Sequence, residues 1–154
     1  MIAVIQRVKR AQVTIGGKVI SQIGSGLLVL VGVHKSDTEA DVTFLAKKIP
    51  ELRIFSDAAG KMNLSLLDIQ GEVLLVSQFT LCADIYRGRR PSFTETASPE
   101  IATGLLEKLI NSIREQGVNV QTGEFAASMH VELVNDGPVT FILDSKNAGI
   151  SIRK

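Results

Sequence analysis

Asn135-Asp136-Gly137-Pro138-Val139-Thr140 separates two segments of alternating apolar residues, Met129 to Val134 and Val139 to Leu143. Each segment has the two-residue period of a β-strand. The first interpretation of the six residues is therefore a hairpin turn. A second starts from their chemistry, because glycine permits close backbone approach and the bond before a proline can be cis. A cis Gly137–Pro138 bond would direct two successive carbonyl oxygens to one side, where they would be rigid acceptors for an amine.

The composition is that of one globular domain. The chain has 154 residues, of which 45% are hydrophobic and 21% charged, and these are ordinary values for a single domain. One cysteine excludes an intramolecular disulfide and is typical of a reducing compartment. We see no signal peptide and no apolar run near the roughly 20 residues of a membrane span. We therefore expect a cytoplasmic protein without membrane association.

Alternating apolar residues predict further strands. Ile2 to Val8 is the first, and a hairpin from Gln12 to Ile23 is closed by Gly16-Gly17, a favourable two-residue turn. Gly26 to Val33 is almost entirely apolar, so we expect both of its faces to be covered. The other predicted strands are Leu52 to Phe55, Glu72 to Leu81 and Val118 to Gln121, with a polar loop over 56–65.

Two segments have the spacing of amphipathic helices. The first follows a capping box of Ser36 and Glu39 and stops at Pro50. The second has Ser98 as its N-cap and Pro99 at its first position. Together with the strands they predict an α+β domain, a mostly antiparallel sheet or barrel with the two main helices packed outside.

The domain is expected to span residues 1–144, followed by a polar, mobile tail over 145–154. The apolar content of Gly26 to Val33 and of Glu72 to Leu81 is high for one small sheet. This favours a homodimer.

Polar residues interrupt the strongest predicted strand at its carboxyl end, over Ser77-Gln78-Phe79-Thr80. Strand ends that lead into loops are common places for active sites. Thr80 is a candidate nucleophile, but a neutral hydroxyl needs a base, and no histidine or carboxylate is near it in sequence. The backbone N–H groups there could instead form an oxyanion hole. A purely structural role is the third option, in which Ser77 and Thr80 satisfy neighbouring backbone groups.

Arginines occur in two settings. Arg87, Arg89 and Arg90 share a loop with aromatic residues, which predicts either phosphate binding or simply a solvated loop. The net charge of +1 and pI of about 7.9 fall short of the pI above roughly 9 that is typical of a dedicated nucleic-acid binder. Arg7 lies in an apolar strand and needs a buried partner, for which carbonyls near Gly137–Pro138 are candidates.

Metal and cofactor binding have no support in the sequence. His34, His130 and Cys82 do not have the spacing of metal ligands. We therefore expect neither a metal nor a cofactor.

The motifs Ser77 to Leu81 and Asn135 to Thr140 together closely resemble the two signatures of the D-aminoacyl-tRNA deacylase family. The resemblance runs from residue 1 to about residue 144. Further matching segments are Met1 to Val8, Arg53 to Asp57, Gly60 to Asn63, Arg90 to Phe93 and Gln121 to Gly123.

The resemblance implies a homodimer that hydrolyses the ester between a D-amino acid and the terminal adenosine of tRNA, with the active sites at the subunit interface. It also implies activity on glycyl-tRNA, including glycine mischarged on tRNA-Ala. In this family the Gly-Pro bond is cis, and the motif of one subunit enters the pocket of the other. Gly137 and Pro138 would then face the substrate's α-amine and reject L-amino acids. Arg7 would hold that motif, and Met129 would lie near it.

The same resemblance places Ser77, Gln78, Phe79 and Thr80 around the scissile ester and the adenosine. Two mechanisms follow. In one, Thr80 is the nucleophile. In the other, which the resemblance favours, the 2′-hydroxyl of the tRNA helps to activate water while N–H groups near Phe79 stabilise the oxyanion. The alternative function is a non-catalytic RNA-binding dimer of the same fold.

Overall fold

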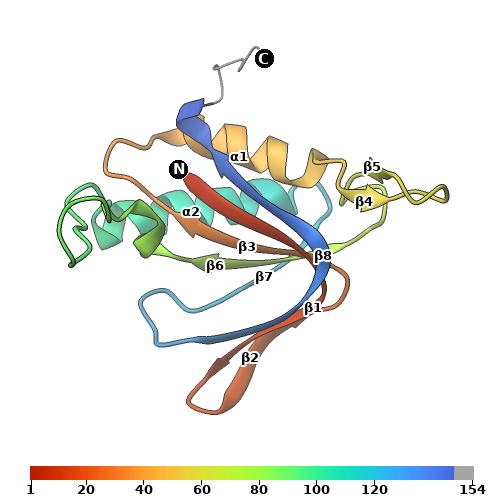
Figure 1. Ribbon diagram of the computed structural model, residues 1–154, viewed down its shortest axis with the longest axis horizontal. Coiled ribbons are helices and arrows are strands. Elements are labelled where there is room, and N and C mark those ends of the chain that lie inside the picture. Colours follow the sequence, from red (N-terminus) through yellow and green to blue (C-terminus); the bar gives the residue numbers. More distant parts are fainter. Residues whose placement is uncertain (148–154) are drawn as a thin grey trace.

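β1 (Ile2–Ile15) is the strand on which the sheet is assembled. It pairs antiparallel with β2 (Lys18–Ile23), β3 (Gly26–Gly32) and β8 (His130–Asp144). β3 then pairs in parallel with β6 (Glu72–Ser77), and β6 in parallel with β7 (Asn119–Thr122). The computed structural model describes residues 1–147. Figure 1 shows α1 (Glu39–Glu51) and α2 (Pro99–Arg114) side by side against the sheet.

The α+β class is confirmed, but the sheet is mixed rather than mostly antiparallel. α1 lies between β3 and β6 in the chain, and α2 lies between β6 and β7. A helix that connects two neighbouring strands returns the chain to the same end of the sheet, which makes the strands parallel. The order of the predicted elements already contained this information.

The hairpin expected at Asn135 to Thr140 is wrong. β8 runs through this stretch without reversing, and both of its halves pair with β1. Asn135 lies opposite Val8 and Thr140 opposite Gln6, so Arg7 alone faces residues 136–139. Such an excess of residues on one strand is a bulge, which lifts backbone out of the ladder. The Gly137–Pro138 peptide bond within it is cis, as the second interpretation expects.

The predicted hairpin between β1 and β2 is confirmed. Gly16 and Gly17 both have positive φ, +56° and +80°, which is the geometry of the two-residue turn that matches strand twist. Both faces of β3 are covered, also as predicted. One face packs on α1 and α2 through residues such as Val29 and Leu45, and the other packs on Leu74 and Val8.

The helix starts are predicted with unequal success. Ser98 caps α2 and accepts a hydrogen bond from the Ile101 N–H, as expected. The capping box of α1 is Thr38 and Asp41 rather than Ser36 and Glu39. The Asp41 carboxylate accepts the Thr38 N–H at 2.8 Å. Pro50 lies inside the last turn, so α1 ends one residue beyond the predicted stop.

Several strand boundaries differ from the prediction, and the first predicted strand and the first arm of the hairpin form one continuous strand, β1. The short strand after α1 is β4 (Phe55–Ser56) rather than Leu52 to Phe55, and it pairs with β5 (Met62–Leu64) inside the expected loop. β6 ends at Ser77, and Phe79–Cys82 form a 3-10 turn, η1. Within residues 1–147, no helix is long and apolar enough to cross a membrane.

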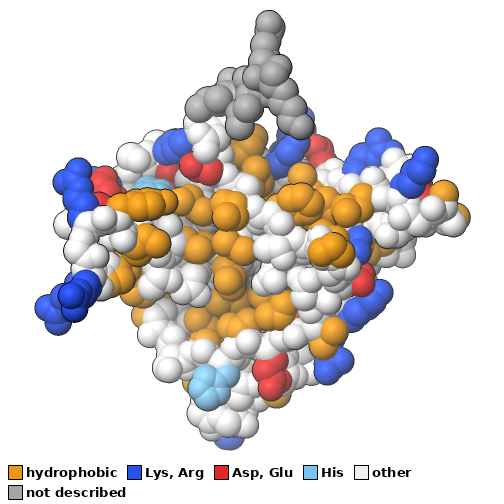
Figure 2. All heavy atoms as spheres, viewed as in Figure 1, with side chains coloured by type: hydrophobic (Ala, Val, Ile, Leu, Met, Phe, Trp, Pro, Cys, Tyr) orange, Lys and Arg blue, Asp and Glu red, His pale blue; other side chains and the backbone are white. Residues whose placement is uncertain are grey.

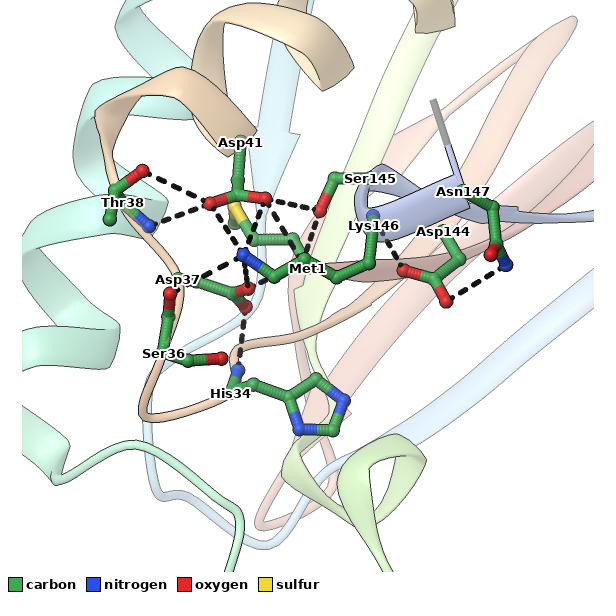
Figure 3. A network of polar contacts seen from close by, with 10 residues as sticks. All are labelled: Met1, His34, Ser36, Asp37, Thr38, Asp41, Asp144, Ser145, Lys146 and Asn147. Atoms are coloured by element: carbon green, nitrogen blue, oxygen red, sulfur yellow. Dashed lines mark hydrogen bonds and ion pairs between the residues drawn. The ribbon is translucent and has the colours of Figure 1, made fainter. Parts of the chain in front are cut away.

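The start of the expected polar tail folds back on the domain. Ser145–Asn147 form a short 3-10 helix, η2, and residues 148–154 lie outside the described part of the chain. Figure 3 shows Ser145 and Lys146 reaching a cluster around the Met1 ammonium group. That ammonium lies 2.8 Å from a carboxylate oxygen of Asp37, and neither group is exposed to solvent. Asp41 is the second carboxylate of the cluster.

This cluster predicts a loss of stability in acid. Burial acts to raise the pKa of Asp41, but hydrogen bonds from Ser145 and Thr38, together with the cationic groups nearby, lower it well below its usual value. A lowered pKa in the folded state adds stability above the unfolded value of about 4, and this is lost as the pH falls below it. Urea unfolding should therefore give a smaller free energy at pH 3 than at pH 6. Asp41→Asn should flatten that difference, and an unchanged pH dependence would contradict this role.

Candidate active site

A cavity of about 530 Å³ lies at the carboxyl end of β6. Its apolar wall includes Val31 and Leu106, and Ser77, Gln78 and Phe79 line it from the strand end and the turn that follows. Met129, which immediately precedes β8, lines it as well. The structure therefore brings together four of the predicted site residues. A larger hollow of about 880 Å³ between β1, β2 and β8 contains none of them.

The backbone at this strand end turns sharply. The Gln78 N–H still bonds to the Val31 carbonyl at 2.8 Å, and the Leu81 N–H bonds back to the Gln78 carbonyl at 3.2 Å. Between them, the N–H groups of Phe79 and Thr80 open the 3-10 turn, and the first N–H groups of a helical turn have no partner within it. Among residues 1–147 we find no acceptor for either of them. Two N–H donors beside a cavity can stabilise an anion.

Gly32, the last residue of β3, makes room for this turn. A Cβ atom at Gly32 would lie 2.9 Å from the Cys82 sulfur and 3.0 Å from the Gln78 carbonyl oxygen. The turn therefore packs directly on the backbone of β3. Burial raises the pKa of Cys82 to about 11, so this thiol is an apolar filler rather than a nucleophile.

Thr80 has no base beside it. Its hydroxyl is 2.5 Å from the Gln78 side-chain nitrogen, an amide that donates a hydrogen bond and takes no proton at neutral pH. Among residues 1–147, no histidine or carboxylate bonds to Thr80, and Thr80 does not line the cavity. Phe79 packs on Phe93, with ring centroids 5.1 Å apart.

The second group of predicted residues surrounds the bulge in β8. Arg7 is 8% exposed, and its Nε donates to the Asp136 carbonyl at 3.0 Å while one Nη donates to the Ile54 carbonyl at 2.6 Å. Its Nε also lies 3.1 Å from the Asp136 carboxylate. The carbonyl that accepts from Arg7 thus belongs to Asp136, one residue before the predicted Gly137. The carbonyls of Gly137 and Pro138 are not used by this side chain.

The two groups are not brought together within one chain. Asp136 shares a cavity with Glu72, at the amino end of β6, whereas Ser77 lines the first cavity at the carboxyl end. The five residue steps between them span about 16 Å of extended strand. Gly137 and Pro138 are therefore outside the pocket formed by their own chain.

Most of the chain is matched by a known family. The family model described as D-Tyr-tRNA(Tyr) deacylase matches residues 4–144. The chain belongs to this family. A deacylase cleaves an acyl bond by hydrolysis, so the protein is an enzyme, a hydrolase acting on ester bonds.

Curated relatives match over nearly their full length. The D-aminoacyl-tRNA deacylase of Thermosipho africanus (strain TCF52B) is 58% identical over 146 residues, which cover 95% of this chain and 98% of the relative. The D-aminoacyl-tRNA deacylase of Geobacillus sp. (strain WCH70) is 53% identical over 146 residues, covering 95% and 96%.

Solved structures share the fold. The c-Myc DNA Unwinding Element Binding Protein superposes with a TM-score of 0.88 and 40% identity, covering 94% of this chain and 98% of that one. A probable eukaryotic D-amino acid tRNA deacylase superposes with a TM-score of 0.81. It is 15% identical and covers 92% of this chain and 97% of its own, which supports the fold alone.

The sequence analysis missed several residues of this deacylase fold that shape the pocket at the end of β6 and the surroundings of Arg7 at the bulge in β8. Phe125 lines the pocket from the loop before β8, and its being the one aromatic residue of that loop was the available signal. Asp136 and Ile54 hold Arg7 through their carbonyls, which no side-chain pattern reports. Gly123 permits close packing of Met129, because a Cβ atom there would be 2.5 Å from the methionine sulfur.

Among residues 1–147, we find no group of three histidine, cysteine, aspartate or glutamate side chains that could hold a metal ion.

Proposed function

We propose that this protein hydrolyses the ester bond of D-aminoacyl-tRNA and so removes D-amino acids from tRNA. The names of its curated relatives point to this substrate. The observation that carries the proposal is the pocket at the end of β6, beside which the N–H groups of Phe79 and Thr80 have no partner among residues 1–147. Such donors are what an ester hydrolase needs for its tetrahedral intermediate.

The proposed active site is completed by a second copy of the chain. Gly137 and Pro138 are exposed and lie about a strand length from their own pocket. Apolar side chains spread across the face in Figure 2. β8 also carries two exposed apolar residues, Ile142, which is 75% exposed, and Phe141. A homodimer would cover this face, because large exposed apolar patches mark interaction surfaces. It would also bring the Gly137–Pro138 segment of one copy to the pocket of the other.

Selection by handedness follows from that arrangement. The side chain of a D-amino acid varies, so a general check must use the amine, the Cα atom and the carbonyl, which all substrates share. Backbone carbonyls of Gly137 and Pro138 would accept the amine and leave room for a substituent on one side only. An L side chain would then meet the Gly137–Pro138 wall, whereas glycine has no side chain to exclude. Glycyl-tRNA, including glycine mischarged on tRNA-Ala, is therefore a second proposed substrate.

The proposed chemistry does not use Thr80 as a nucleophile. Its one side-chain partner is the Gln78 amide, which cannot take the hydroxyl proton. The 2′-hydroxyl next to the ester on the terminal ribose supplies an alternative group close to the reacting carbon. In this mechanism it assists a water molecule, and the Phe79 N–H group stabilises the oxyanion.

Thr80→Ala tests this choice. If water assisted by the 2′-hydroxyl is the nucleophile, the variant should keep its kcat within about tenfold of the wild type, since only a hydrogen bond to Gln78 is lost. The measurement is single-turnover hydrolysis of D-Tyr-tRNA, with thermal unfolding as a control for folding. Loss of nearly all activity in a folded Thr80→Ala protein would support the acyl-enzyme route instead.

The direct test of the proposed function is a pair of incubations, one with D-Tyr-tRNA and one with L-Tyr-tRNA. We expect rapid loss of the D ester and no loss of the L ester beyond its spontaneous rate. Cleavage of both would identify a general esterase. No cleavage of the D ester at micromolar protein would favour the alternative, a non-catalytic RNA-binding dimer. That alternative draws its support from the net charge of +1 and from the lack of a base bonded to Thr80 among residues 1–147.

A further inference from the structure

Residues 85–91, the arginine loop, form a compact positive surface outside the pocket. Arg87, Arg89 and Arg90 lie in it without any acidic residue between them, and all seven of its residues are exposed. Tyr86 is 93% exposed, which is unusual for a large aromatic ring. Among residues 1–147, none of the three arginines forms an ion pair. The loop thus offers free positive charge beside a free aromatic face.

The loop has a defined shape. Asp84 and Ser92 close its base with two backbone hydrogen bonds of 2.9 Å each, and the Asp84 carboxylate accepts the Tyr86 N–H at 2.9 Å. Gly88 turns the tip with a φ of +75°. These contacts keep the three arginines and Tyr86 together on one small projection of the surface.

The base of the loop adjoins the pocket. Phe93 follows Ser92 directly and packs on Phe79, which lines the pocket. The nearby segment supplies Thr96 and Ala97 to the same wall. In Figure 1 the loop is the green segment at the left, beyond the end of β6, and Figure 2 shows a cluster of Lys and Arg side chains projecting at that edge.

We propose that the arginine loop binds the single-stranded 3′ end of the tRNA, with the arginines on its phosphates and Tyr86 stacked on a base. This inference rests on the proposed function, which puts the ester of the terminal nucleotide in the pocket. The preceding nucleotides must then leave across the rim. Guanidinium groups bind phosphates through paired hydrogen bonds, and base stacking on an aromatic ring is the usual way to hold unpaired nucleotides.

Because the net charge of the chain is small, binding of RNA requires a local positive surface. At +1, the net charge of the chain gives little general attraction to RNA. An acidic protein segment would also pair with the arginines, but it offers no base for Tyr86. The aromatic ring among the arginines therefore favours single-stranded nucleic acid over an acidic peptide.

The test compares two substrates that differ only in the chain beyond the pocket, D-Tyr-tRNA and 3′-O-D-tyrosyl-adenosine. For the variant R87Q/R89Q/R90Q, kcat/KM on the tRNA at low salt should fall between about 10-fold and 100-fold. The salt dependence of log kcat/KM should become shallower by about two, as expected for three lost phosphate contacts on a single strand. Tyr86→Ala should lower kcat/KM on the tRNA by about tenfold. Neither variant should change the rate on the adenosine ester.

Two control variants separate position from charge. K18Q/K47Q/K48Q removes the same charge from exposed sites outside the loop and should leave both substrates unaffected. The variant R87K/R89K/R90K keeps the charge and should restore most of the salt-dependent part of the rate. Equal rates of the Gln variant and the wild type on tRNA would overturn the inference, as would equal losses on both substrates.

Fluorescence anisotropy can measure the affinity for uncharged tRNA. Because this measurement needs no hydrolysis, it tests the inference independently of the proposed function. A wild-type protein that leaves D-Tyr-tRNA intact would contradict the proposed function. The loop itself would still be supported if R87Q/R89Q/R90Q bound the tRNA at least tenfold more weakly at low salt, a loss of the size expected for three phosphate contacts. Unchanged affinity in that variant would overturn the inference whatever the catalytic result.

Discussion

Arg7→Ala is expected to lower D-aminoacyl-tRNA hydrolysis by about 100-fold, the cost typical of a small misplacement of a group that positions the substrate. Arg7 donates to the carbonyls of Asp136 and Ile54, at 3.0 Å and 2.6 Å, and it is 8% exposed. Without Arg7, these two carbonyls lose a charged donor, and the bulge that contains Gly137 is no longer held. The free energy of unfolding should fall by about 3–6 kcal/mol, since the two hydrogen bonds to this charged group contribute about 1.5–3 kcal/mol each.

Lys9→Ala is the matched control. Lys9 lies 3.2 Å from the same Asp136 carboxylate, but its side chain is 64% exposed. Ion pairs at such sites contribute at most about 1 kcal/mol, so activity should stay within about twofold of the wild type. Urea unfolding and single-turnover hydrolysis measure both quantities. Equal effects of Arg7→Ala and Lys9→Ala would show that Arg7 does not position the motif.

Gly32→Ala is expected to reduce hydrolysis by a similar factor through the other half of the site. The added methyl group would be 2.9 Å from the Cys82 sulfur and 3.0 Å from the Gln78 carbonyl oxygen. The 3-10 turn must therefore move away from β3, and the N–H groups of Phe79 and Thr80 move with it. Loss of one oxyanion donor costs about 10²–10³ in kcat. Overpacking of this kind also destabilises by about 1–3 kcal/mol.

Gly104→Ala provides the control for Gly32→Ala. Gly104 lies in α2, and a Cβ atom there would have no neighbour within 4 Å. The change should leave kcat unaltered and stabilise the helix by up to about 1 kcal/mol. Hydrolysis rates and thermal unfolding of both variants test these expected changes in kcat and stability. A Gly32→Ala protein with wild-type kcat would show that the exact position of the turn does not matter for catalysis.

The sequence predicted the elements with the strongest periodicity. The β1–β2 hairpin, both helices and the fully covered β3 are confirmed, because a glycine pair, an N-cap and a continuous apolar run are local signals. β8 was divided in two because Asp136-Gly137-Pro138 is ordinarily a turn. Pairing of both halves with β1 outweighs that local preference, and such long-range pairing leaves no mark in a single segment.

The predicted site residues divide between two places in the chain, and their roles remain predictions. Ser77, Gln78 and Phe79 line one pocket at the strand end where polar residues interrupt the apolar run. Met129 was expected beside Gly137 and Pro138 but lines that same pocket, which Gly137 and Pro138 of its own chain do not reach. The 3-10 turn at Phe79 was not predicted, because alternation of side chains extended β6 too far. The capping box of α1 was misplaced for a related reason. Ser36 and Glu39 have the same spacing as Thr38 and Asp41, and only the folded backbone selects between them.

The proposal that two copies build each active site is tested most directly with a mixed dimer. Arg7→Ala impairs the motif, and Gly32→Ala impairs the pocket. Co-expression of the two variants with different affinity tags, followed by two purification steps, isolates dimers with one chain of each. If the motif of one chain serves the pocket of the other, one of the two sites in this dimer is intact. The mixed dimer should then hydrolyse D-Tyr-tRNA at about half the wild-type rate. If each chain forms its own site, both sites are impaired, and a rate as low as that of the two parent variants would contradict the account.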